Sequence, residues 1–167
     1  MPIPNSEKLK TYVDTDVIIN LFKEEDHRSK NAMTFFMLCL KNSSKVTLLT
    51  SDLLFKEIFG VSKDQDLKIS ENNFFYKLLE NRKNLIKINA SSAQIQLAQK
   101  LGGDNWKDLL HYILAKQLEA DYLVSNNVPH MRLVKTIYTE KINEYKKDIR
   151  ILRPIEYVKL LDGGESK

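Results

Sequence analysis

Acidic and amide side chains follow several short apolar runs of this 167-residue chain, and their types and spacing suit metal-dependent chemistry. Carboxylates that converge from separate segments repel one another, which favours a cation between them. Hard oxygen ligands suit Mg²⁺ or Mn²⁺, which can activate water and stabilise the charge of a phosphodiester transition state. The candidate residues are Asp14, Asp16, Asp52, Glu57, Asp104, Asp108, Asn126 and Asn127.

Several of these residues also have an ordinary structural interpretation. Asp14 ends an apolar run, where a carboxylate has little structural use, but Asp16 could equally cap the helix that follows. Asp104 could cap a helix after two glycines, and Glu57 could be a solvated surface residue. Asp52 suits the first turn of a helix, whose dipole favours an acid. His111 is more simply a hydrogen-bonded structural residue than a base or a ligand, and Tyr12 and Cys39 are most simply core residues.

The elements that must position these side chains alternate between short apolar runs and longer helical patterns. This alternation predicts an α/β protein, a three-layer α/β/α sandwich with a central parallel sheet of about five strands. In such sheets the functional crevice lies outside the carboxyl ends of the strands, which is where the acids occur. The predicted strands are residues 11–13, 46–49, 85–88, 122–124 and 149–152; the predicted helices begin near residues 17, 32, 53, 74, 91, 106 and 154.

Composition limits the class of protein. A chain of this length favours a single domain over residues 1–167, and its hydrophobic content of 43% excludes a disordered tail. The single cysteine excludes a disulfide framework and a cysteine-based zinc site. Neither a secretory leader nor a membrane span is apparent, so we expect a cytoplasmic protein with no membrane partner.

The charge distribution permits a polyanionic partner. There are 26 basic and 22 acidic residues. Setting aside five candidate site acids (Asp14, Asp16, Glu57, Asp104 and Asp108) leaves 17 acidic against 26 basic residues. An acidic pocket within a basic body suits a polyanion whose reacting phosphate meets bound cations.

Two stretches together resemble the PIN-domain nucleases. Residues 12–19, Tyr-Val-Asp-Thr-Asp-Val-Ile-Ile, look like the opening motif of that family, and residues 107–115 followed by 119–127 are similar to its third motif and the strand after it. The resemblance implies a divalent-metal-dependent endoribonuclease, in many small members the toxin of a VapBC-type toxin–antitoxin pair. It implies an RNA substrate, an antitoxin protein as partner and a homodimer.

The resemblance also implies roles for particular residues. Asp14, Glu57 and Asp108 would be the catalytic acids that hold Mg²⁺ or Mn²⁺, with Asp104 as a catalytic helper and Asp16 and Asn127 as accessory residues. Asn127 is a departure, because the family often has an acid there and an amide adds no charge. This departure leaves open a weakened or inactive domain that binds RNA or protein without cleaving.

A phosphatase-like motif and the segment of residues 128–148 each allow another interpretation. Asp14-Thr15-Asp16 and the run from Gly103 to Asp108 imitate the motifs of haloacid-dehalogenase-type phosphatases, in which Asp14 would attack phosphorus. The second of those motifs should follow an apolar strand, whereas here a helical pattern precedes it. Residues 128–148 mix basic and acidic side chains and predict a helical insertion, either solvated or facing RNA or a partner.

Overall fold

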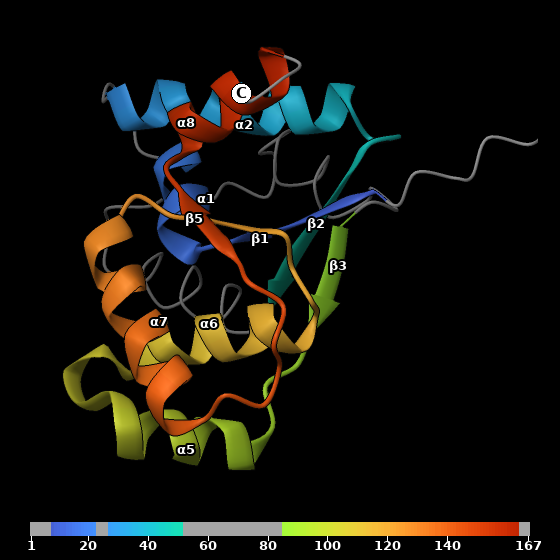
Figure 1. The fold of residues 1–167 in the computed structure, drawn as a ribbon. Coiled ribbons are helices and arrows are strands. Elements are labelled where there is room, and N and C mark those ends of the chain that lie inside the picture. Colours follow the sequence, from blue (N-terminus) through green and yellow to red (C-terminus); the bar gives the residue numbers. More distant parts are fainter. Residues whose placement is uncertain (1–7, 23–26, 52–84, 164–167) are drawn as a thin grey trace, which may run out of the picture.

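A parallel β-sheet forms the middle layer of the protein (Figure 1). The computed structural model describes residues 8–22, 27–51 and 85–163. Its strands are β1 (Leu9–Val13), β2 (Val46–Ser51), β3 (Leu85–Ile88), β4 (Tyr122–Val124) and β5 (Arg150–Leu152). They lie in the order β3-β2-β1-β4-β5, and every pairing is parallel. The prediction of an α/β protein with a parallel sheet of about five strands is therefore confirmed.

Helices cover both faces of this sheet, as the buried residues show. One face packs against α5 (Ser92–Gly102), α6 (Trp106–Gln117) and α7 (Val128–Lys141). The other face packs against α1 (Thr15–Phe22), α2 (His27–Lys41) and α8 (Pro154–Asp162). Figure 1 shows these two sets of helices on opposite sides of the strands. The arrangement is consistent with the predicted three-layer sandwich.

Local sequence signals account for the ends of several helices. Ser91 caps α5, because its hydroxyl accepts the N–H of Gln94 while the Gln94 side chain accepts the N–H of Ser91. Gly103 ends that helix with a φ of 54°, a left-handed conformation that glycine adopts without strain. A short 3₁₀ turn (Gly103–Asn105) then leads directly into α6. Pro154 starts α8, where its missing N–H costs nothing.

The predicted insertion at residues 128–148 is only partly helical. Helix α7 covers Val128–Lys141 and buries Val128, Met131, Val134 and Tyr138. Residues 143–149 then run to β5 without regular structure. Hydrogen bonds from two helices fix this segment in place. Lys116 Nζ of α6 donates to the Lys147 carbonyl, and Lys135 Nζ of α7 donates to Asp148 at 2.7 Å.

The burial of Cys39 and the character of the helices bear on two other predictions from the sequence. Cys39 is a core residue as predicted, and burial raises the pKa of its thiol to about 12. Among the described helices, none combines the length and the apolar character that crossing a membrane requires. The predicted helices beginning near residues 53 and 74 lie outside the described residues.

Candidate active site

The register between β1 and β4 places two chemically active segments side by side. Val13 pairs with Val124, so the residues that follow, Asp14 and Ser125, leave the sheet at the same edge. The Asp14 N–H continues the ladder by donating to the Val124 carbonyl at 2.9 Å. These are central strands, and their carboxyl ends are where α/β sheets place functional groups.

Asp14 is a buried carboxylate whose two oxygens are both hydrogen-bonded. It is 5% exposed. Ser125 Oγ donates to Asp14 Oδ2 at 2.8 Å, and the Thr15 N–H donates to Oδ1 at 2.7 Å. Ser125 Oγ in turn accepts the Asn127 N–H at 3.0 Å. Because a buried charge is tolerated only with such partners, these bonds hold Asp14 in one orientation.

Asp16 lies close to two other carboxylates. The Asn126 N–H donates to Asp16 Oδ2 at 3.1 Å, while the buried Oδ1 has no hydrogen-bond partner among the described residues. Burial raises the pKa of Asp16 to about 8, and repulsion from Asp14 and then from Asp108 adds to that rise. A cation bound beside Asp16 would offset this repulsion and favour the ionised carboxylate.

Asp108 reaches the same edge from the first turn of α6. Its Oδ2 lies 3.7 Å from Nδ1 of His130, which extends from the first turn of α7. The Asp108 carboxyl is 26% exposed and the His130 side chain 53% exposed, so both remain accessible to a ligand from solvent. The structure therefore brings together Asp14, Asp16 and Asp108, three of the acids that the sequence singled out.

His111 supports the site from within the core. Its Nδ1 is hydrogen-bonded to the Tyr12 hydroxyl at 2.8 Å, and its Nε2 to Thr15 Oγ1 at 3.2 Å. Nε2 also lies 3.8 Å from Asp14 Oδ1. The prediction of a hydrogen-bonded histidine is confirmed, and Tyr12 is a core residue whose hydroxyl holds this histidine.

The remaining predicted residues are placed differently. Asp104 is exposed on the 3₁₀ turn and makes no hydrogen bond or ion pair with the described residues, so nothing in the geometry joins it to the other acids. Asn127 begins α7, and its backbone, rather than its side chain, bonds to Ser125. Asp52 and Glu57 lie outside the described residues.

Sequence reasoning missed two groups at this edge, Ser125 and His130, whereas Asn126 was among the candidate residues. The Asn126 side-chain nitrogen is buried without a hydrogen-bond partner in the described part of the protein. The position of Ser125, directly after an apolar strand, was the signal for its role. His130 follows a proline in a mixed polar stretch and carries no such signal.

The donor set has the right chemistry for a hard cation. Asp14, Asp16 and Asp108 offer carboxylate oxygens, and Asp16 Oδ1 is buried without a partner among the residues described. Over the described ranges, however, no group of three or more acidic, histidine or cysteine side chains is arranged so that it could hold a metal ion. A cation beside these acids would need further ligands from water, substrate phosphate or other protein oxygens.

Comparison with known proteins adds no relative: no protein-family model matches this chain, and no curated protein matches it.

Proposed function

We propose that this chain is a divalent-metal-dependent endoribonuclease of the PIN type. The observation that carries the proposal is the convergence of Asp14, Asp16 and Asp108 at the carboxyl ends of β1 and β4, where burial, and then repulsion from Asp14 and Asp108, raise the pKa of Asp16 to about 8. Such repulsion costs stability unless a ligand offsets it, which makes a cation site the simplest reason for the arrangement. The basic remainder of the chain suits RNA as the polyanion.

In this proposal Asp14 and Asp108 hold Mg²⁺ or Mn²⁺, with Glu57 as the third protein ligand. When bound, the metal supplies an activated water and stabilises charge on the phosphoryl oxygens. Ser125 keeps Asp14 turned toward the edge of the sheet through its 2.8 Å hydrogen bond. Asp16 would lie beside this cation, with one buried oxygen that has no hydrogen-bond partner among the described residues.

Two alternatives are distinguished by specific residues. Asn127 leaves no acid directly after β4, which favours a domain that binds RNA or protein without cleaving. A phosphatase of the haloacid-dehalogenase type requires Gly103-Asp104 to follow a strand, but these residues follow helix α5. The geometry therefore disfavours the phosphatase and keeps the binding domain as the second candidate.

Cleavage of a fluorescent single-stranded RNA tests the proposal. We expect cleavage with Mn²⁺ or Mg²⁺ that EDTA abolishes, and a loss of at least about a hundredfold in Asp14→Asn or Asp108→Asn. Asp162→Asn, an exposed acid at the end of α8, is the matched control and should keep full activity. RNA binding without cleavage in either metal supports the second candidate, and activity unchanged by excess EDTA refutes the metal mechanism.

The toxin role and its partners need a separate test. If the chain is the toxin of a toxin–antitoxin pair, its expression in a bacterial cytoplasm should arrest growth, and a small antitoxin protein should co-purify with it when both genes are present. A homodimer should appear as twice the chain mass in light scattering. Growth that is unaffected by a protein active in the RNA assay excludes the toxin role but leaves the nuclease proposal standing.

A further inference from the structure

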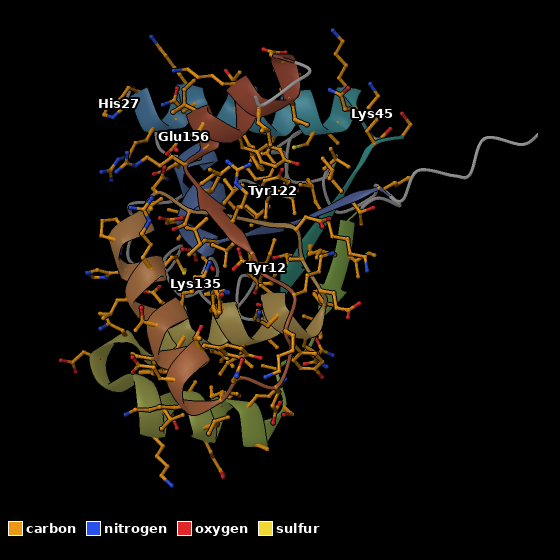
Figure 2. All side chains as sticks on the ribbon, viewed as in Figure 1. Tyr12, His27, Lys45, Tyr122, Lys135 and Glu156 are labelled. Carbon is orange, nitrogen blue, oxygen red and sulfur yellow. The ribbon has the colours of Figure 1, made fainter. Side chains whose placement is uncertain are left out.

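A groove lies along the outer edge of β5. Its cavity, of about 340 Å³, is lined by residues 148–152, by Arg132 and Lys135 of α7, and by Glu156 of α8. Among the described strands β5 is the last one on this side of the sheet, so its outer edge forms the floor of the groove. Figure 1 shows β5 between α7 and α8, and Figure 2 labels Lys135 and Glu156 on the two flanks of this strand.

At the floor of the groove, the backbone of β5 has hydrogen-bonding groups that point away from β4. In the pairing with β4, the Arg150 N–H donates to Asp121 and the Leu152 carbonyl accepts the Ser125 N–H. Residues of a parallel ladder alternate in the side to which their N–H and C=O point. The N–H and C=O of Ile151 therefore face away from β4 and toward the groove, where an added strand would bond.

The flanks of the groove carry excess positive charge. Arg132, Lys135 and Arg150 line it together with two acids, Asp148 and Glu156. Asp148 accepts a hydrogen bond from Lys135 at 2.7 Å, and Glu156 accepts the N–H of Arg153 at 3.3 Å.

Neither arginine of the groove pairs with a described acid. Among the described residues neither Arg132 nor Arg150 forms an ion pair, although Arg150 lies 5.8 Å from the centre of the Tyr122 ring. The Ile149 carbonyl already accepts Lys135 Nζ at 3.1 Å, which leaves the Ile151 backbone and the two guanidinium groups to favour a carboxylate-bearing ligand.

We propose that this groove binds an extended, acidic segment of a partner protein, which adds to the sheet as a strand beside β5. Backbone bonds to Ile151 would hold the segment, and its acidic side chains would pair with Arg132 and Arg150. Ile151 packs with the buried residues of α7, so alternate side chains of the added strand face that helix. None of the acids proposed to bind a metal lines this groove, and the proposal does not depend on the nuclease activity.

Charge complementarity also distinguishes this occupant from a second copy of the chain. Pairing of two β5 edges about a two-fold axis would bring the arginines of each groove close to those of the other copy, which is unfavourable. An acidic segment meets the same cations with opposite charge. A partner strand of opposite charge is therefore the occupant that the groove favours.

Binding of synthetic peptides to the full chain tests the proposal. The probe is a fluorescein-labelled nonapeptide of alternating glutamate and valine, and the control replaces every glutamate by lysine. By fluorescence anisotropy we expect saturable binding of the glutamate peptide alone, weakened at least about tenfold by Arg132→Glu. Lys141→Glu, an exposed lysine more than two turns further along α7, should change the affinity less than about twofold.

Methylated peptides test whether the backbone takes part. Because only alternate N–H groups of an added strand point toward β5, N-methylation of either the valines or the glutamates should abolish binding, while methylation of the other set should not. The Ile151 amide should also exchange its hydrogen more slowly in the complex. Equal binding of both methylated peptides, equal binding of the lysine peptide, or no binding at low salt overturns the proposal. A groove that instead binds a single-stranded RNA oligonucleotide in an Arg132-dependent way also overturns it.

Discussion

The Asp16→Asn variant tests the electrostatic reasoning behind the site. The pKa of Asp16 is about 8 in the folded protein, against an ordinary value of 3.8. Between these two pH values Asp16 is protonated in the folded protein but ionised in the unfolded chain. The folded state therefore loses stability as the pH rises from about 4 to about 8. Asparagine carries no charge at any pH, and its side-chain oxygen can still accept the Asn126 N–H. The variant should gain stability relative to the natural protein across this window.

The magnitude follows from the size of the shift. At about 1.4 kcal/mol for each pKa unit, the full shift corresponds to roughly 5 kcal/mol at pH 8 and to about a third of that at pH 5. Asp16 keeps some contact with solvent, which screens the repulsion. We therefore expect a gain of about 1–2 kcal/mol at pH 8 and less than about 1 kcal/mol at pH 5.

Urea denaturation in EDTA, followed through the single tryptophan Trp106 and by circular dichroism, measures these free energies of unfolding. Asp162→Asn is the control for loss of one carboxylate and should behave alike at both pH values. Adding Mn²⁺ at about a hundred times its dissociation constant should stabilise the natural protein by about 2.7 kcal/mol at pH 8, and Asp16→Asn by less. A gain that is the same at pH 5 and pH 8 refutes the reasoning, because Asp16 would then ionise without cost.

Three other substitutions probe the surroundings of Asp14. Tyr12→Phe removes the hydroxyl bonded to His111 in the core and should lower the free energy of unfolding by about 1–3 kcal/mol in urea denaturation; no change would mean that this bond contributes nothing. Ser125→Ala removes the hydroxyl that donates to Asp14 Oδ2 and should reduce RNA cleavage about 10–100-fold, with activity rescued by Ser125→Thr; equal rates in the alanine and threonine variants would contradict the positioning role. Asn127→Asp restores an acid after β4 and should tighten Mn²⁺ binding in calorimetry, whereas an unchanged affinity would place this side chain outside the metal site.

Much of the fold could be predicted from the sequence because its strands are short, apolar and well separated. Strands β3 and β4 coincide with their predicted ranges, since polar residues bound them on both sides. Strand β2 runs on through Thr50 and Ser51, which are buried but carry no hydrophobic signal. Helix α2 begins at His27, five positions before its predicted start, because its first turns are polar and make few core contacts.

The candidate site could be predicted only in part. The chemistry of Asp14, Asp16 and Asp108 is visible in their residue types and in their positions beside apolar runs. Their proximity depends on the order of the strands, which places β4 against β1, and no local pattern encodes that order. The pairing of β1 with β4 also places Ser125 beside Asp14, so the sequence does not predict the hydrogen bond between them. Asp104 is a candidate because it lies one turn before Asp108, but its side chain is exposed and bonds to none of the described residues, which residue spacing alone does not reveal.

The central position of β1 also determines when the site can exist during synthesis of the chain. Strands β2 and β3, which follow β1 along the chain, add to one side of β1, and β4 and β5, which come later, add to the other. Asp108, Ser125 and Asn126 are translated about a hundred residues after Asp14 and Asp16. A nascent chain shorter than this holds Asp14 and Asp16 but lacks Asp108 and the Ser125 hydroxyl that bonds to Asp14. The three acids can therefore come together only after β4 has been synthesised and has paired with β1.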